Sequence, residues 1–225
     1  MNKICVVFDL DDTLYKEKEF VRSAFREICN IYSSNNDTAD FLFDKMMYAF
    51  DNNGNAFTTL LNLIPSETLS VEGLLTLYRE HKPKLSLNAD TKTILTILRE
   101  NKVEIGLITD GRTVSQRNKI EALGLTKYIR EENIVISEEF GSCKPDKLNF
   151  LHFMEKYPDC QTFIYVGDNL EKDFITPNTL GWKSICLADN GENIHKQNFN
   201  IRTEYLPKYI VNSLKEILFI LSLRE

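Results

Sequence analysis

The chain has 225 residues, which is enough for one large domain or for a core domain with a smaller insertion. Hydrophobic residues make up 43% and charged residues 27%, with 9 glycines and 6 prolines, so collagen-like, low-complexity and wholly disordered chains are excluded. The 27 basic and 33 acidic residues give a net charge of −6 without any long basic block, which argues against nucleic acid and anionic membranes as partners.

Short, continuous apolar runs mark the expected strands. Residues 4–8 are rich in side chains that favour strands and end in an acidic turn, as is typical of a strand buried on both faces of a parallel sheet. Similar runs occupy residues 103–108, 134–136, 163–166 and 184–187. Helices are expected between them at residues 90–101, 113–123, 146–157 and 170–180. This alternation predicts an α/β fold built from parallel βαβ units with right-handed crossovers.

One interval breaks the alternation. Residues 10–102 have helical periodicity and no convincing strand pattern, and they are far more than one crossover needs. We therefore predict an all-helical insertion, the cap, at residues 16–86, and an α/β core made from residues 1–15 and 87–225. The helices expected in the cap lie at residues 19–32, 39–50, 56–63 and 71–81.

The last part of the chain has a helical pattern. Ile210, Leu214, Ile217 and Leu221 recur at helical spacing, which predicts an amphipathic C-terminal helix. Packing on the core sheet is favoured over binding a partner. Residues 190–200 are polar and are expected to form a loop.

Cysteine usage and the apolar runs favour a reducing compartment. The five cysteines are odd in number, widely spaced and without a CxxC pair, which argues against a disulfide framework or a zinc site. The first apolar run is too short for a signal-peptide core, and residues 217–223 are too short to span a bilayer. We expect a cytoplasmic protein, as a monomer or a homodimer, without a membrane partner.

Polar residues follow several expected strands at the point where each strand ends. In open α/β sheets, ligands bind beyond the carboxyl ends of the strands, so these residues are the first candidates for a site. Four carboxylates and one lysine should meet there. The four carboxylates are those of Asp9, Asp11, Asp168 and Asp173, and the lysine is Lys144. The full set of polar or glycine residues at the strand ends is Asp9, Asp11 and Thr13 after the first strand, Thr109, Asp110 and Gly111 after the second, Lys144 after the third, and Gly167, Asp168 and Asp173 after the fourth.

The residue types at this edge suit phosphate chemistry. Asp9 and Asp11 are two positions apart, so extended backbone places both carboxylates on one side, roughly 6 to 7 Å apart. One carboxylate can attack phosphorus to form an acyl phosphate, and the other can transfer protons to the leaving oxygen and from water. These different roles require different pKa values for the two groups.

A divalent cation is expected beside this pair. Asp9, Asp168 and Asp173 would repel one another without compensation, and oxygen ligands without histidine suit Mg²⁺ rather than zinc. Mg²⁺ would also offset the charge of a phosphate approaching an acidic protein. Lys144 supplies a fixed positive charge, and the Thr109 hydroxyl with the turn amides after it can donate hydrogen bonds to phosphoryl oxygens.

Each motif alone also has a purely structural explanation. An acidic turn can cap a helix, Asp110-Gly111 is a common turn pair, Lys144-Pro145 can begin a helix, and Gly167-Asp168 can be an N-cap. Their order, each at a strand end or a helix start, favours a single catalytic site.

The ordered set of motifs resembles the phosphatase branch of the haloacid dehalogenase-like (HAD) hydrolase superfamily. The resemblance covers nearly the whole chain, through about residue 188, and implies a Rossmann-like sheet with a helical cap inserted after the first motif. An acid at position 11 favours phosphate chemistry over metal-free dehalogenation. The resemblance rests on these residues, in chain order: Asp9-x-Asp11-x-Thr13, then Thr109, Lys144 and Gly167-Asp168-x-x-x-x-Asp173.

The resemblance also implies a role for each matching residue. Asp9 would be the nucleophile and Asp11 the general acid/base. Thr109 would hold the transferred phosphoryl group, and Lys144 would steady Asp9 and the phosphoryl charge. The remaining implied assignments are Mg²⁺ binding by Asp9, by the backbone carbonyl of Asp11 and by Asp168, with Asp173 supporting either the metal or the lysine.

These expectations lead to a Mg²⁺-dependent phosphomonoester hydrolase that acts through a phosphoaspartate intermediate. A cap that closes over the site favours a small phosphorylated metabolite as substrate. Asp110, Gly111 and Arg112, beside the second motif, are the candidate substrate-binding residues, and Arg112 is a candidate contact to the leaving group. The alternatives are a phosphotransferase or phosphomutase of the same fold, and a non-hydrolytic phospho-signalling or binding module.

Overall fold

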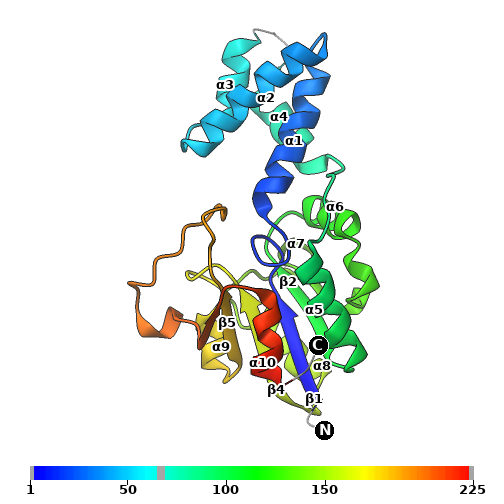
Figure 1. Cartoon of the computed structure of the whole chain (residues 1–225), viewed down its shortest axis with the longest axis vertical. Coiled ribbons are helices and arrows are strands. Elements are labelled where there is room, and N and C mark those ends of the chain that lie inside the picture. The colour runs from blue at the N-terminus through cyan, green and yellow to red at the C-terminus, as the bar shows by residue number, and fades with distance from the viewer. Residues whose placement is uncertain (1–2, 65–68, 223–225) are drawn as a thin grey trace.

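A six-stranded, all-parallel sheet forms the base of the molecule, and four helices stand above its carboxyl edge (Figure 1). This computed structural model describes residues 3–64 and 69–222. The strand order is β3-β2-β1-β4-β5-β6, so the direction of winding reverses beside the central β1. The strands are β1 (Lys3–Phe8), β2 (Glu104–Thr109), β3 (Ile134–Ile136), β4 (Cys160–Gly167), β5 (Lys183–Leu187) and β6 (Tyr209–Val211).

Side chains of β1 alternate between two apolar layers. Val6 and Phe8 are buried in the layer that is covered by α5 (Ala89–Glu100), α6 (Thr113–Leu123) and α10 (Ile217–Leu221). Cys5 and Val7 belong to the opposite layer, which α8 (Leu148–Lys156) covers with two phenylalanine rings. Both faces of the strand are therefore apolar, as its uninterrupted run of hydrophobic residues predicts, and the α/β fold class is confirmed.

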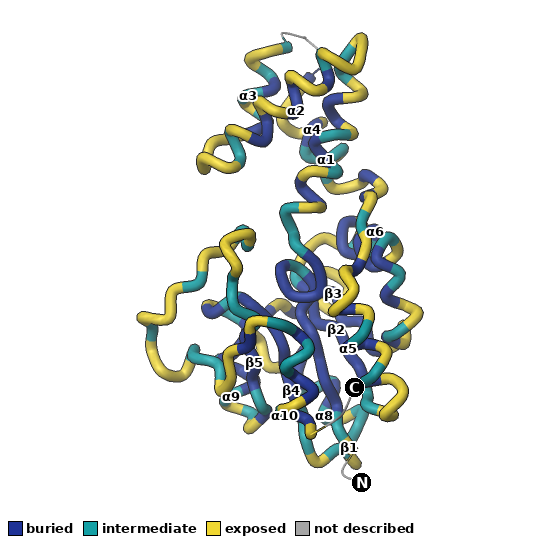
Figure 2. The backbone as a smooth tube through the Cα atoms, viewed as in Figure 1, coloured by how far each residue is buried: buried dark blue, intermediate teal, exposed yellow. Residues whose placement is uncertain are grey.

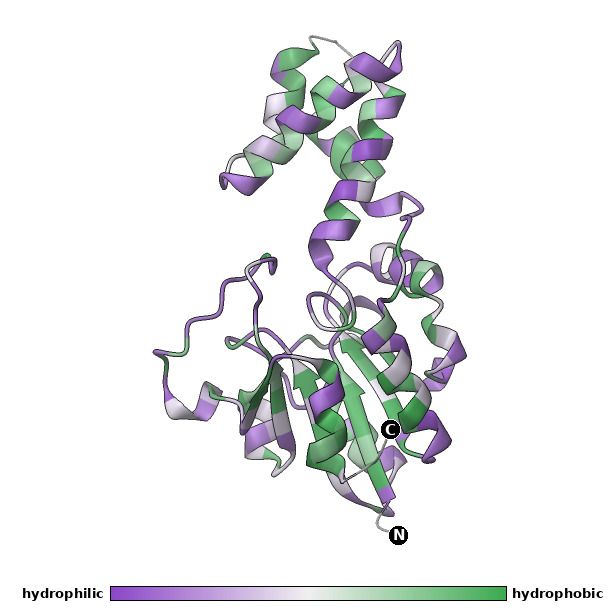
Figure 3. Ribbon diagram, viewed as in Figure 1, coloured by the Kyte–Doolittle hydropathy of each residue, from purple (hydrophilic) through white to green (hydrophobic). Residues whose placement is uncertain are grey.

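The four helices above the sheet have an apolar core of their own, and Figure 2 shows where their buried residues lie. The last three of these helices each have an N-cap residue whose side chain accepts a hydrogen bond from the backbone amide three residues later. These N-cap residues are Asn35, Asn55 and Ser70. Figure 3 shows apolar residues on the inner sides of these helices and polar residues outside. The helices are α1 (Glu17–Ile31), α2 (Asn36–Asp51), α3 (Ala56–Leu63) and α4 (Val71–Glu80).

The prediction of a C-terminal helix is wrong for its first residues, which form a strand. Tyr209–Val211 pairs with β5 as an edge strand, with Ile210 opposite Cys186. Ile210 and Val211 are β-branched, and pairing satisfies backbone groups at the sheet edge that a helix would leave exposed. Helical structure starts only after Ser213, which forms a capping box with Glu216.

The helix predicted at residues 170–180 is shorter than expected. Only α9 (Ile175–Thr179) is α-helical, because the preceding turn follows the Asp173 side chain, which accepts hydrogen bonds from the amides of Asp168 and Asn169. A short helix that the sequence did not predict, α7 (Ser137–Phe140), follows β3. None of the described helices is both long and apolar enough to cross a membrane.

Close packing between β2 and α8 leads to a stability prediction. A Cβ atom at Gly106 would collide with the ring of the buried Phe153, whereas a Cβ at Gly73, in exposed α4, would meet only the Ser70 hydroxyl at 3.4 Å. We expect Gly106→Ala to lower the free energy of unfolding by about 1–3 kcal/mol through overpacking. Gly73→Ala, the matched control, should raise it by about 0.5–1 kcal/mol through helix propensity. Urea unfolding of both variants measures the difference, and equal effects would contradict the packing of β2 on α8.

Candidate active site

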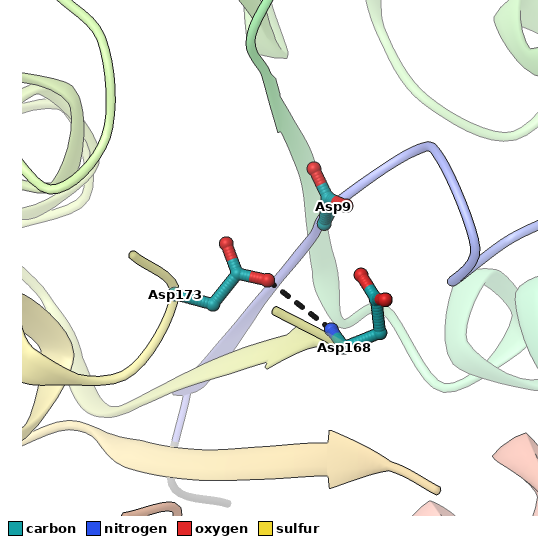
Figure 4. Close-up of side chains that lie close together, drawn as sticks. All are labelled: Asp9, Asp168 and Asp173. Carbon is teal, nitrogen blue, oxygen red and sulfur yellow. Dashed lines mark hydrogen bonds between the residues drawn. The ribbon is translucent and has the colours of Figure 1, made fainter. Parts of the chain in front are cut away.

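Three aspartates lie together beyond the carboxyl ends of the central strands. Figure 4 shows Asp9 at the end of β1, Asp168 at the end of β4, and Asp173 in the following turn. Each offers a carboxylate oxygen within 4.8 Å of the others, and all three residues are buried. The Asp9 amide donates to the carbonyl of Val166 at 2.8 Å, which fixes the end of β1 against β4.

Lys144 joins two of these carboxylates. Its ammonium donates to Asp9 Oδ1 at 2.6 Å, to Asp173 Oδ1 at 2.7 Å and to the Tyr165 hydroxyl at 3.0 Å, and its side chain is fully buried. Burial alone would lower the pKa of Lys144, but the charges of Asp173 and Asp9 raise it well above its ordinary value. Lys144 is therefore a fixed positive charge at the site.

Both carboxylate oxygens of Asp173 accept hydrogen bonds from the protein. Oδ1 accepts from Lys144, and Oδ2 accepts from the backbone amides of Asp168 at 3.1 Å and Asn169 at 2.9 Å. Gly167 permits this approach, because a Cβ there would collide with the Asp173 carboxylate. Of the two roles that the resemblance leaves open, these contacts favour orienting the lysine.

The remaining two carboxylates suit a cation. Burial, together with the charges of Asp9 and Asp173, raises the pKa of Asp168 to about 9. Burial also raises the pKa of Asp9 to about 7, although Lys144 opposes the shift. A further positive charge beside them would therefore favour the ionised form of both groups. The group contains only carboxylate oxygens, a donor set that fits Mg²⁺.

Two hydroxyl groups near the site have no hydrogen-bond partner among the described residues. They belong to Thr109, at the end of β2, and Thr13, after β1, and both are buried. A buried polar group without a partner is costly, so each is available to a ligand oxygen. The position of Thr109 at a strand end suits the binding of an oxyanion.

Asp11 is held by a set of residues that the sequence did not single out. Tyr15 donates its hydroxyl to Oδ1 at 2.5 Å, Gln116 donates its amide to Oδ2 at 3.2 Å, and Lys119 donates to both oxygens at 2.8 Å. Burial would raise the pKa of Asp11, but Lys119 and the other donors lower it overall. These donors therefore fix the position of the Asp11 side chain and favour its ionised form.

Two of these donors, Gln116 and Lys119, belong to α6, and their role becomes readable only when the buried face of that helix is known. The buried stripe of this helix contains Ser115, Gln116, Asn118 and Lys119 where an ordinary core-facing helix would carry apolar residues. Polar side chains on a buried helix face indicate a site rather than a core.

The predicted substrate-binding residues lie in the loop between β2 and α6. Asp110 accepts from the Lys144 amide at 3.1 Å and pairs with Lys172 at 3.2 Å. The Gly111 amide donates to Ser137 Oγ at 2.9 Å. Arg112 pairs with Glu138 at 2.5 Å, and its side chain is 62% exposed. Asp110 thus contacts the backbone of Lys144, while Arg112 lies at the surface.

Comparison with known proteins found a matching family model and a curated relative. A family model described as haloacid dehalogenase-like hydrolase matches residues 6–187. A curated relative, the glyceraldehyde 3-phosphate phosphatase of Methanocaldococcus jannaschii, is 27% identical over 222 residues, which cover 94% of each chain.

Solved structures show the same fold over the whole chain. YfnB from Bacillus subtilis, solved bound to magnesium, has a TM-score of 0.67 at 20% identity and covers 99% of this chain and 100% of its own. A HAD phosphatase from Thermococcus onnurineus has a TM-score of 0.60 at 22% identity, with coverages of 96% and 97%. A 2-haloacid dehalogenase from Pseudomonas syringae has a TM-score of 0.60 at 19% identity and covers 99% of each chain. The match of the family model over most of the chain confirms that the protein belongs to the haloacid dehalogenase-like hydrolases.

Proposed function

We propose that this hydrolase is a Mg²⁺-dependent phosphatase that cleaves a small phosphorylated metabolite through a phosphoaspartate intermediate. The observation that carries the proposal is the buried contact of Lys144 with Asp9 at 2.6 Å, together with the Thr109 hydroxyl, which has no hydrogen-bond partner within residues 3–64 and 69–222. These are a candidate nucleophile, a fixed cation and a free donor at one strand edge, which are the groups that phosphoryl transfer to an enzyme carboxylate needs.

The reaction proceeds in two displacements. An oxygen of Asp9 attacks phosphorus, and the bond from phosphorus to the leaving oxygen breaks while Asp11 gives that oxygen a proton. Water then attacks the phosphorus of the phosphoaspartate and gives a proton to Asp11, and the bond to Asp9 breaks to release inorganic phosphate. Lys144 and the Thr109 hydroxyl hold the phosphoryl oxygens throughout.

Mg²⁺ would be held by Asp9, by Asp168 and by the backbone carbonyl of Asp11. Bound there, it would offset negative charge on the phosphoryl group. The raised pKa values of Asp9 and Asp168 support this assignment, because burial disfavours two neighbouring carboxylates without a cation.

The cap and the curated relative support a small substrate. Four helices stand above the strand edge (Figure 1), and a cap that closes over a site excludes water and large molecules. The relative in Methanocaldococcus jannaschii is named for glyceraldehyde 3-phosphate. Three-carbon phosphates are therefore the first compounds to assay, followed by sugar phosphates and nucleotides.

Replacement of the nucleophile tests the mechanism. Asp9→Asn should abolish Mg²⁺-dependent phosphate release from every substrate of the panel, because an amide does not form the phosphorylated intermediate. The assay is inorganic phosphate release with and without Mg²⁺. The matched control is Asp159→Asn, which removes an exposed aspartate that pairs with Lys3 away from the site.

Two outcomes would contradict the mechanism. Release that is equal in the protein and in Asp9→Asn would show that Asp9 is not the nucleophile. If the unchanged protein releases phosphate from no substrate, the phosphatase proposal is refuted. The result would then favour a phosphotransferase or phosphomutase, or a non-hydrolytic phospho-signalling or binding module.

Metal binding should stabilise the protein more at high pH than at low pH. Burial raises the pKa of Asp168 from its ordinary 3.8 to about 9, so the folded protein holds a proton that the unfolded chain releases. The contribution of Asp168 to the stability of the metal-free protein is therefore lost as the pH rises between about 4 and 9. Mg²⁺ competes with this proton, so the gain in Tm on adding Mg²⁺ should be larger at pH 8 than at pH 5.5.

Thermal unfolding followed by circular dichroism measures this gain. Asp168→Asn should reduce the gain at pH 8, whereas Asp159→Asn should leave it unchanged. A gain that is the same at both pH values, or that survives in Asp168→Asn, would contradict the assignment of Asp168 as a ligand.

A further inference from the structure

A second buried lysine lies where the core meets the cap. Lys119 is on α6 of the core, and its side chain is only 4% exposed. Its ammonium contacts both oxygens of Asp11 at 2.8 Å and lies 4.4 Å from the centre of the Phe20 ring on α1. Burying an ammonium is costly unless it is paired, so this position requires the carboxylate beside it.

The contacts of Asp11 leave it no free acceptor position. A carboxylate has about four lone-pair positions, two on each oxygen. Tyr15 and Lys119 fill those of Oδ1, and Gln116 and Lys119 fill those of Oδ2. As it is held here, Asp11 can neither take a proton from water nor carry one toward a leaving oxygen. At least one donor must move before proton transfer.

Lys119 is the donor with another carboxylate in reach. Glu17, the first residue of α1, places its Oε1 4.0 Å from the ammonium, and its side chain is 25% exposed. A short movement of the Lys119 ammonium would break its contact with Asp11 and form one with Glu17. The amide of Glu17 donates to Asp12 at 3.0 Å, so the start of the cap is tied to the loop that carries Asp11.

We propose that Lys119 is a positioning residue for the acid/base: its ammonium holds the Asp11 carboxylate, and its movement to Glu17 frees one acceptor position on each oxygen of Asp11. The proposal rests on the proposed phosphatase function. In the second displacement, the freed position takes the proton of the attacking water as the bond between phosphorus and Asp9 breaks. Lys119 then returns to the carboxylate once the proton has left.

Rapid-mixing kinetics with p-nitrophenyl phosphate and Mg²⁺ separate this step from the first. Nitrophenolate leaves without a proton, so its release reports attack by Asp9, while steady turnover includes the water step that needs Asp11. We expect Lys119→Met to retain a rapid burst of nitrophenolate, equal to one per active site, followed by steady turnover reduced about 10- to 100-fold. Lys119→Arg, which keeps a cation, should recover part of that rate.

Two further variants make the test specific. Glu17→Gln removes the alternative carboxylate, so it should give the same burst with a smaller loss of steady turnover. In an Asp11→Asn background, Lys119→Met should cause no additional loss, because the two residues act through one group. The control is Lys82→Met, which removes an exposed lysine at the same junction of cap and core, and which should behave as the unchanged protein.

Several outcomes would overturn the proposal. They are an equal loss of burst rate and steady turnover in Lys119→Met, a further loss in the Asp11→Asn background, and an unchanged rate in Glu17→Gln. Thermal unfolding checks that each variant is folded, and Lys119→Gln replaces Lys119→Met if the latter is not. Turnover by none of the proteins, the unchanged one included, refutes the phosphatase function itself, whereas turnover with equal losses refutes only the role of Lys119.

Discussion

A buried ammonium group connects the parts of the active site. Lys144 comes from the segment after β3, yet it contacts Asp9 after β1 and Asp173 after β4. Without it, two buried carboxylates would face each other with no cation from the chain between them, at a cost of several kcal/mol. The rest of the site depends on this contact, because Asp173 in turn fixes the amides of the turn that carries Asp168.

Much of the fold could be predicted because strands buried on both faces leave a simple pattern. The first strand is an uninterrupted apolar run, and its register with β2 and β4 brings their carboxyl ends to one edge. β6 could not be predicted in this way. Its three residues are compatible with a helix, and only pairing with β5, far away in the chain, makes them a strand.

The site was predictable to a similar extent. Residues at strand ends are brought together by topology alone, so Asp9, Thr109 and Asp168 could be expected to meet. Gln116 and Lys119 could not, because their roles arise from the packing of α6 against the first residues of the cap. The function of polar side chains on a buried helix face cannot be inferred until their partner is known. That partner, Asp11, lies more than one hundred positions away in the chain.

The two buried lysines differ in the freedom that their surroundings allow. Lys144 is fully enclosed between two aspartates and Tyr165, and the nucleophile role proposed for Asp9 would benefit from such a rigid partner, because the attacking oxygen must stay aligned with phosphorus. Lys119 has Glu17 at 4.0 Å as a second partner from the cap. The acid/base role proposed for Asp11 requires this residue to give and accept a proton in turn, and a cation that can move to a second partner would suit that role. Because Glu17 begins α1, the position of the cap and the availability of Asp11 would be coupled through this one ammonium.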